Sequence, residues 1–524
     1  MKEIKNPVLT GFHPDPSLLC VGSDFYIANS TFEYYPSVQI SHSKDLANWD
    51  TVGAVLDEKQ LNMVGNTSSG GVWAPCITYC DGVFYIVYSD VKSWRGDPFK
   101  DTHNFIAKAK NIEGPYDEGV YINSSGFDAS LFHDDDGKKY FVNMEWNWKK
   151  AIGGDQFSGI LVTELDSKTL RPVNKSFNVF KGSKRKLTEG PHIFKKNDYY
   201  YLITAEGGTS YQHAVTIARS KDIYGPYEIH PNTHLATSDG NWEAPVKKTG
   251  HGSLCEGPDG RWFLATLCGR PVDGTLVCPL GRETAINEVV WTDDWPYLKN
   301  GTSTMSESFL GYGEKKEQDK VMHYDFSKDN FKKDFMSLRK KCDYKVEGDS
   351  LVLTGHESPV SNHNQSFLGR RQEHFNFRAT VDMNFNSTNF QEMAGITYRY
   401  DELSYYYLFV ANDGYDKDQN LYIMSFQQGN FSLPLGEKGI RLKGYKGNIT
   451  LRVESHLAEA MFSYSTDYGK SFTKIPYILD VHYLSDEKAT PMGFTGAFIG
   501  MQCCDLQYGA KEARFKNFAY EILD

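Results

Sequence analysis

A turn followed by an aromatic-rich strand recurs through the first three hundred residues of the chain. In most copies an Asp-Gly or Asn-Asp turn precedes alternating aromatic and branched side chains, which is typical of a hairpin strand. The aligned aromatic residues are 59, 55, 61 and 62 positions apart. A unit of about 60 residues with several strands matches a propeller blade. Residues 1–310 are therefore predicted to form a five-bladed β-propeller, with the repeat aromatics at Tyr26, Tyr85, Tyr140, Tyr201 and Phe263.

The repeat ends after Ser308, and the pattern of the remaining chain changes. Residues 311–321 are rich in charge and are predicted to be a linker. Further on, segments such as 375–383 and 449–453 alternate apolar and polar residues, as half-buried strands do. We therefore predict an all-β protein, in which a β-sandwich of the jelly-roll or concanavalin-like kind occupies residues 322–524.

Composition and charge narrow the classes of partner. Aromatic residues make up 14% of the chain and glycines number 46, which favours strands and tight turns. A net charge of −11 argues against binding to nucleic acid or to an anionic membrane. The sequence has no apolar leader and no apolar run of the ~20 residues that span a bilayer. Its nine scattered cysteines lack zinc-binding spacing, so we expect reduced thiols in a cytoplasmic protein.

Polar residues recur at one offset from the repeat aromatics. The offset is twelve residues in four copies and eleven in the first. Equal offsets mean equivalent positions on successive blades, so these side chains should converge at one mouth of the central channel. The alternative, that each acid only caps a turn, does not explain why three acids share the offset. The converging residues are Asp15, Trp73, Asp128, Glu189 and His251.

Three carboxylates in an aromatic pocket suit acid–base chemistry on a polyol. Glycoside hydrolysis needs one protonated acid for the leaving oxygen and one ionised carboxylate for water or the anomeric carbon. A third negative charge nearby raises the pKa of the acid. Trp73 and Phe32 offer flat apolar faces on which sugars stack, although Phe32 suits a core position equally well.

Nine short segments occur in an order that is specific as a set. They are residues 6–17, 30–36, 71–75, 100–104, 125–130, 188–192, 204–209, 279–284 and 494–501. This set resembles glycoside hydrolase family 43, close to its cytoplasmic β-xylosidases, over nearly the whole chain. The resemblance implies a five-bladed propeller and inversion at the anomeric carbon. One departure is Ala129, where many relatives have proline, and it removes no functional group.

The resemblance also implies roles for individual residues. Asp15 would be the general base that activates water, Glu189 the general acid, and Asp128 the residue that tunes and orients the acid. Arg282 resembles an arginine that binds substrate hydroxyls, the alternative being a surface ion pair. A phenylalanine of the C-terminal domain reaches over the propeller mouth in the family, and Phe498 is the candidate here, the alternative being a sandwich-core residue.

His251 resembles a channel histidine that helps some relatives to hold a water or a divalent cation. A purely structural, hydrogen-bonded histidine is an equal alternative. We therefore expect no required cofactor and assign no firm metal ligand, and a cation such as calcium in the channel stays an open alternative.

These observations predict an exo-acting, inverting β-xylosidase that removes xylose from the non-reducing ends of β-1,4-xylooligosaccharides. An α-L-arabinofuranosidase side activity is expected, and a primary α-L-arabinofuranosidase is the alternative. A β-fructosidase would want Asn-Asp-Pro-Asn at the first acid, where this chain has Pro14-Asp15-Pro16-Ser17, and a non-catalytic sugar-binding protein needs no acid triad. The expected partners are the oligosaccharide and further copies of the chain, as a dimer or a tetramer, with no nucleic acid and no membrane.

Overall fold

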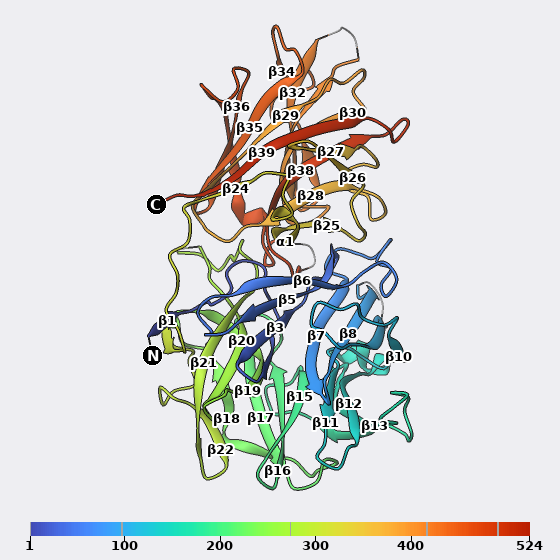
Figure 1. Ribbon diagram of the computed structural model, residues 1–524, viewed down its shortest axis with the longest axis vertical. Coiled ribbons are helices and arrows are strands. Elements are labelled where there is room, and N and C mark those ends of the chain that lie inside the picture. The colour runs from blue at the N-terminus through green and yellow to red at the C-terminus, as the bar shows by residue number, and fades with distance from the viewer. Residues whose placement is uncertain (1, 96–97, 273, 415–417, 490–491) are drawn as a thin grey trace. The chain divides into compact units, whose positions relative to one another are not determined.

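The computed structural model describes residues 2–95, 98–272, 274–414, 418–489 and 492–524. The chain forms two compact units (Figure 1). The first comprises the residues up to Arg270 together with Arg282–Lys316, and the second comprises Pro271–Gly281 together with Glu317–Asp524. The predicted propeller, residues 1–310, includes residues 271–281, whereas these residues group with the second unit.

Within the described residues, the first unit contains five antiparallel sheets of four strands each. Each sheet begins with an inner strand, and the next inner strand along the chain contacts it. The last inner strand returns to the first, which closes the ring and confirms the five-bladed propeller. The inner strands are β2 (Ser17–Val21), β7 (Gly71–Cys80), β11 (Ser130–His133), β15 (Glu189–Lys196) and β19 (Lys247–Glu256).

The outer strands follow each inner strand in chain order. Blades one and two add β3 (Asp24–Asn29), β5 (Ser37–Ser43), β6 (Asp50–Leu56), β8 (Val83–Ser93), β9 (Asp101–Ala109) and β10 (Val120–Asn123). Blades three and four add β12 (Lys139–Trp146), β13 (Phe157–Leu165), β14 (Phe177–Phe180), β16 (Tyr199–Glu206), β17 (Ala214–Ser220) and β18 (Glu228–Thr237). Blade five adds β20 (Trp262–Gly269), β21 (Glu283–Thr292) and β22 (Trp295–Leu298). Shorter elements of this unit are β1 (Glu3–Lys5), β4 (Tyr34–Tyr35), the 3-10 helix η1 (Trp148–Gly153) and β23 (Ser308–Leu310).

The repeated turns and aromatics explain why this part of the chain forms blades. Gly82, Gly137 and Gly260 lie at the first hairpin of their blades with φ near +80°, a conformation that favours glycine. The aromatic residue that follows is buried between neighbouring sheets, as for Tyr201, which shares an apolar cluster with Trp262 of the next blade. The start of the chain also pairs with the segment that follows the last blade, because β1 and β23 form a separate two-stranded sheet.

The second unit is a β-sandwich, as the sequence predicted. One sheet has the strand order β26 (Tyr344–Glu347), β27 (Ser350–Thr354), β39 (Glu512–Ile522), β29 (Phe377–Asn384), β35 (Asn448–His456), β36 (Glu459–Ser465) and β37 (Thr473–Asp480), with β24 (Val321–Tyr324) on β39. The other runs β33 (Asn430–Ser432), β32 (Gln419–Gln427), β31 (Tyr405–Asn412), β30 (Glu392–Arg399), β38 (Phe498–Asp505), β28 (Ser366–Arg371) and β25 (Phe335–Leu338), with β34 (Ile440–Arg441) on β32. The helices are α1 (Phe331–Asp334) and the 3-10 helix η2 (Val481–Tyr483).

Alternate residues of the two sheets supply the core of the sandwich. Phe377 of one sheet meets Tyr398 of the other edge to face, with ring centroids 5.7 Å apart. Both belong to one continuous cluster of buried apolar side chains. This is the pattern expected when strands bury every second residue. Among the described residues, no helix has the length and apolar character needed to cross a membrane.

Candidate active site

The residues that share the repeat offset lie at corresponding places in the five blades. Asp15 and Asp128 each precede an inner strand by two residues, and Glu189 is the first residue of one. Trp73 and His251 lie within β7 and β19. Because inner strands line the axis of a propeller, these side chains gather around one end of the channel, and their contacts confirm that grouping.

The backbone at these positions is held in an uncommon conformation. Asp15, Asp128 and His251 have φ values of 52°, 54° and 45°. Ala74, directly after Trp73, and Gly190, directly after Glu189, also have positive φ. Strand pairing shifts register at these points in β7, β15 and β19. Bulges of this kind re-aim side chains and are enriched at active sites, where the surrounding fold holds the strain.

Gly190 places the backbone against two of the predicted site residues. Its N–H donates to Asp128 Oδ2 at 3.2 Å, which ties Asp128 to the residue after Glu189. A Cβ atom at position 190 would lie 2.9 Å from His251 Nε2. A side chain does not fit in that space, so glycine is what lets the strand start pass this close to the histidine.

A serine follows three of the site residues by two positions and joins neighbouring blades. Ser17 Oγ accepts the Ile77 N–H of blade two at 3.0 Å. Ser130 Oγ donates to the Pro191 carbonyl of blade four at 2.6 Å. Ser253 Oγ donates to the Pro16 carbonyl of blade one at 2.7 Å. These bonds fix the spacing of the site residues from blade to blade, and the signal for them, Asp-x-Ser or His-x-Ser, is visible in the sequence.

Asp15 is a buried carboxylate surrounded by donors and positive charge. Ser30 Oγ donates to its Oδ2 at 2.6 Å, and Arg282 Nη1 donates to its Oδ1 at 3.0 Å. His251 Nδ1 lies 3.7 Å from the same Oδ1. Burial by itself would raise the pKa of Asp15, but Arg282, His251 and the Ser30 hydrogen bond outweigh it and hold the pKa below its usual value. Asp15 is therefore ionised over a wide range of pH.

Glu189 and Asp128 are displaced in the opposite direction. Burial and the Asp15 charge raise the pKa of Glu189 to about 7, although Lys100 and Arg282 oppose the rise. Burial, Glu189 and Asp15 raise the pKa of Asp128 well above its usual value. The cluster thus combines one carboxyl group whose pKa is lowered with two whose pKa values are raised.

An aromatic box beside the acids contains a lysine that we did not single out from the sequence. Lys100 Nζ lies 4.6 Å from the centre of the Trp146 ring. It lies 5.4–5.6 Å from the ring centres of Trp73, Trp94 and Phe127. Burial lowers its pKa to about 8, while the acids pull the other way. The sequence could have indicated Lys100, because it is the first residue of segment 100–104, one of the segments that carry the family resemblance.

Arg282 and Phe32 belong to the same cluster. The Arg282 guanidinium lies 5.4 Å from the centre of the Phe32 ring and donates to Thr209 Oγ1 at 2.9 Å. Phe32 in turn lies 6.2 Å from the Trp73 ring. Arg282 is therefore a buried partner of Asp15 and not a surface ion pair. Thr209 is a second residue that sequence reasoning missed.

The surroundings of His251 bear on the open alternative of a cation in the channel. Its ring faces one carboxylate, Asp15, and the fixed positive charge of Arg282 lies beside that same oxygen. No group of three or more His, Cys, Asp and Glu side chains suited to a metal occurs among the described residues. The protein groups present at His251 thus offer a cation one shared acidic oxygen, which is a poor match for the six to eight oxygen ligands that calcium takes.

Phe498 lies in the second unit, as the first residue of β38, in register with Arg371 and Arg399. The register places it at a strand end. Its contact with substrate stays a prediction.

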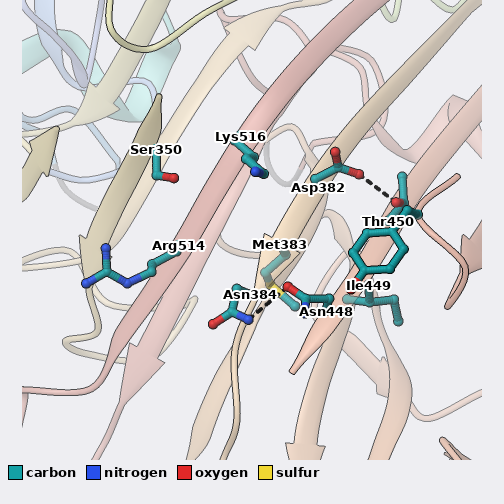
Figure 2. A pocket seen from close by; sticks show the side chains of 10 residues that line it. Ser350, Asp382, Met383, Asn384, Asn448, Ile449, Thr450, Arg514 and Lys516 are labelled. Carbon is teal, nitrogen blue, oxygen red and sulfur yellow. Dashed lines mark hydrogen bonds between the residues drawn. The ribbon is translucent and has the colours of Figure 1, made fainter. Parts of the chain in front are cut away.

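A groove on the sandwich is a second place to compare with the acid cluster as a candidate site (Figure 2). Its volume is about 220 Å³. Asp382 supplies the acidic side chain among its described lining residues, and both of its oxygens accept hydrogen bonds, from Thr450 and Asn517. A lone, fully bonded carboxylate does not provide the acid and base that glycoside hydrolysis requires. The groove is lined by Ser350, Asp382, Met383, Asn384, Asn448, Ile449, Thr450, Tyr468, Arg514 and Lys516.

Comparison with known proteins agrees with this arrangement. The chain is 42% identical to a xylosidase/arabinosidase 43B of Humicola insolens, over 99% of this chain and 98% of that one. It is 40% identical to a beta-xylosidase of Bacillus subtilis, over 99% of both. A xylan beta-1,4-xylosidase structure from Bacillus halodurans superposes with a TM-score of 0.94 at 41% identity, covering 99% of this chain and 100% of that one.

Two family descriptions match the chain one after the other, and the first spans residues 271–281 as well, which group with the second unit in the structure. Residues 323–521 match the beta xylosidase C-terminal concanavalin A-like domain, so the sandwich is of the concanavalin-like kind. Residues 4–296 match glycosyl hydrolases family 43. With the propeller, the carboxyl cluster and these matches together, the chain belongs to glycoside hydrolase family 43.

Proposed function

We propose that this chain is an inverting, exo-acting β-xylosidase, which releases xylose from the non-reducing end of β-1,4-xylooligosaccharides and also cleaves α-L-arabinofuranosides. The observation that carries the proposal is the opposite displacement of two carboxyl groups in one buried cluster. The pKa of Asp15 is lowered and that of Glu189 is raised to about 7. One ionised and one protonated carboxyl are what glycoside hydrolysis needs.

Asp15 acts as the general base in this proposal. It takes a proton from a water molecule, whose oxygen attacks the anomeric carbon on the face opposite the leaving group. Arg282 and Ser30 bind Asp15 and keep it ionised and oriented for this step. Because the pKa of Asp15 is held below its usual value while that of Glu189 is raised to about 7, the base is ionised at pH values at which the acid is still protonated.

Glu189 acts as the general acid. It donates its proton to the glycosidic oxygen as the bond to the anomeric carbon breaks, so that the sugar leaves as an alcohol. Asp128, bound through the Gly190 N–H, orients this group, while burial and the Asp15 charge raise its pKa. General acid catalysis typically contributes ~10²–10⁴-fold to the rate, and most where the leaving group is a poor one.

The remaining residues bind sugar in the proposal. Trp73 and Phe32 supply apolar faces, and Arg282 and His251 supply hydrogen-bonding groups. Lys100 joins them because its ammonium faces the acids from within the aromatic box. Phe498 completes the set as a lid that limits the pocket to few sugar units.

The alternative is that α-L-arabinofuranosidase is the main activity of the enzyme. It is favoured by the relative from Humicola insolens, whose name covers both sugars. The deciding experiment compares kcat/KM on aryl β-D-xyloside and aryl α-L-arabinofuranoside, with β-1,3-linked xylobiose as a test of the linkage. A higher kcat/KM on the arabinofuranoside would make that activity the primary one.

Inversion has its own test. Proton NMR of freshly digested xylobiose should show α-xylose before mutarotation. Appearance of β-xylose first would rule out a single displacement and require a covalent intermediate instead.

The place of action and the assembly complete the proposal. All nine cysteines are free thiols, which supports a reducing compartment such as the cytoplasm. The reaction uses no cofactor, and activity that survives dialysis against a chelator is the expected result. A loss of activity that calcium restores would assign a cation to the channel. A homo-oligomer, dimer or tetramer, is expected, and light scattering of the purified protein decides between them.

A further inference from the structure

We propose that Glu206 is a positioning residue for the general acid Glu189, and that it acts through the loop of residues 183–188. The proposal rests on the proposed function, because it assumes that Glu189 donates a proton. Glu206 is the last residue of β16, is completely buried, and belongs to none of the groups assigned to the substrate. Its hydrogen bonds, the backbone of the loop and a second connection to Arg282 carry the argument.

The Glu206 carboxylate binds both ends of the loop that leads to the acid. Its Oε1 accepts the Ser183 N–H at 2.6 Å and the Thr188 hydroxyl at 3.0 Å. Its Oε2 accepts the hydroxyls of Ser183 and, at 2.8 Å, of Thr216. Thr188 is the residue directly before Glu189. One carboxylate therefore closes the loop across its two ends, next to the point at which β15 begins.

The loop backbone depends on such an anchor. Lys186 and Leu187 have φ values of 64° and 54°, a conformation that costs non-glycine residues free energy. Gly182, which precedes the loop, has a φ of 82°, and a Cβ atom there would lie 1.9 Å from Thr188 Oγ1 and 2.8 Å from Glu206 Oε1. The two ends of the loop therefore pack directly against the carboxylate, and a side chain at position 182 would clash with it. A strained segment holds one conformation only where its surroundings fix it.

The same residue leads into the loop that holds Arg282. Gly207 and Gly208 follow Glu206 with φ values of 82° and 72°, and Thr209 then accepts the Arg282 hydrogen bond at 2.9 Å. The Gly207 N–H donates to the Lys186 carbonyl at 2.9 Å, which links the two loops. Glu206 therefore lies at the junction of the segment that carries the acid and the segment that supports the arginine beside Asp15.

The chemistry of the site requires a carboxylate and not an amide. Four donors point at its two oxygens, and an ionised carboxylate accepts at both. In the Glu206→Gln variant one of these oxygens becomes an NH₂ group. The amide nitrogen then faces a donor, either the Ser183 N–H or a hydroxyl that must turn. Whichever oxygen is replaced, two of the four hydrogen bonds to the carboxylate are altered, so the loop end next to Glu189 is held less firmly.

The experiment measures how the loss of activity depends on the leaving group. Glu206→Gln, Glu206→Asp and Thr188→Val are compared on xylobiose and on an aryl xyloside whose leaving group needs no proton. A shift of about 1 Å in a catalytic group costs on the order of 10²-fold. We expect the Gln variant to lose about that much kcat on xylobiose, several-fold less on the activated substrate, and little in KM. Thr188→Val, which removes one bond at the loop end, should show the same pattern more weakly.

Thr216→Val is the matched control. It removes a β17 hydroxyl that binds the same carboxylate and reaches the loop only indirectly, through His234 and Arg185, so it should change the ratio of the two activities less than Thr188→Val does. Equal losses on both substrates in the folded Gln and Thr188 variants would overturn the proposal, and so would wild-type activity in both. Circular dichroism and the melting temperature establish folding, and the Asp and Thr188 variants serve if the Gln variant does not fold.

Glu189→Ala separates this proposal from the assignment of the acid. If Glu189→Ala loses far more activity on xylobiose than on the aryl xyloside, the acid is assigned, and the Glu206 variants then test positioning alone. If Glu189→Ala loses both activities equally, the acid assignment fails, and the positioning of that acid by Glu206 is overturned with it.

Discussion

Asp15 and Glu189 lie in one buried cluster, yet their pKa values move apart. The difference arises from their contacts, because Asp15 binds Arg282 directly while Glu189 is reached by positive charge only at longer range. The sequence predicted which acids meet, and the role of Asp128 in tuning the pKa of Glu189 stays a prediction, since burial and Asp15 raise that pKa. It did not predict Lys100 as a neighbour, because the four rings that surround this lysine come from four separate places in the chain.

Lys100→Met should move the alkaline limb of the pH profile upward. The positive charge of Lys100 lowers the pKa of Glu189, so its removal lets that pKa rise above about 7. Because the acid works only while protonated, kcat/KM should then persist to higher pH, although its plateau falls as a sugar contact is lost. Lys149→Met, next to the exposed Trp148 ring, is the control and should leave the limb in place. An unchanged or lower alkaline limb in Lys100→Met would contradict the interaction.

Glu189→Gln should stabilise the fold at alkaline pH and not at acid pH. The pKa of Glu189 is higher in the folded protein than its ordinary value, so its protonated form favours folding below about pH 4.5. That contribution is lost as pH rises through about 7, where a buried charge appears. The melting temperature of Glu189→Gln, relative to wild type, should therefore be higher at pH 8 than at pH 4.5. An equal difference at both pH values would show that Glu189 is not displaced.

At the scale of strands, the five-fold repeat was readable because each blade reuses one hairpin with one aromatic offset. The bulges could not be predicted from the sequence. The positive φ of Asp15, Asp128 and His251 arises from packing against neighbouring blades, and the residue types do not indicate it. The serines at positions 17, 130 and 253 show the intermediate case. Their spacing from the site residues is regular, but their partners are carbonyl and N–H groups of the next blade, which a sequence does not reveal.

Ser130→Ala should affect the general acid Glu189, and Ser253→Ala should affect the general base Asp15. Loss of the Ser130 bond leaves the Pro191 carbonyl beside Glu189 unpaired, at a cost of about 1–3 kcal/mol in stability. We expect the alkaline limb of kcat/KM to shift in this variant. Loss of the Ser253 bond frees the Pro16 carbonyl beside Asp15, so the acidic limb should shift instead. The two variants control for each other, and identical pH profiles would argue against separate positioning.

At the scale of the molecule, the propeller followed by a sandwich was predictable from the change of pattern after residue 308. The membership of residues 271–281 in the second unit was not predictable, because this segment is short and its sequence contains no repeat or run of charge that would mark it. Within that unit the Ala497 N–H donates to the Pro279 carbonyl at 3.0 Å, and the Glu487 carboxylate accepts the Cys278 N–H at 2.9 Å. These bonds join positions more than two hundred residues apart.

Phe498→Ala separates a lid from a core residue. From a lid the change should raise KM for xylooligosaccharides and leave the melting temperature nearly unchanged. From the sandwich core it should cost about 3–5 kcal/mol of stability, and KM should stay as it is. Thermal unfolding and initial rates on xylobiose and xylotriose measure both. A large fall in melting temperature with an intact KM would end the lid hypothesis.

A fragment that ends at residue 316 should associate and bind hydrophobic dyes. It keeps residues 271–281 but lacks the rest of the unit with which they group, so Val272, Val277 and Leu280, all buried in the whole chain, lose their cover. The same fragment with 271–281 replaced by a glycine–serine segment of equal length is the control and should associate less. Size-exclusion chromatography distinguishes the two, and a monodisperse first fragment would contradict the expectation.

The path of the chain through residues 271–281 also bears on how such proteins are recombined. A module that occupies one contiguous stretch is exchanged by a single crossover at its border. Here the second unit is interrupted, and a complete exchange requires junctions at 270/271, 281/282 and 316/317. A single crossover at residue 316 would leave a foreign piece of one module embedded in the other, directly before Arg282. Recombination should therefore favour transfer of the coding sequence for both units together.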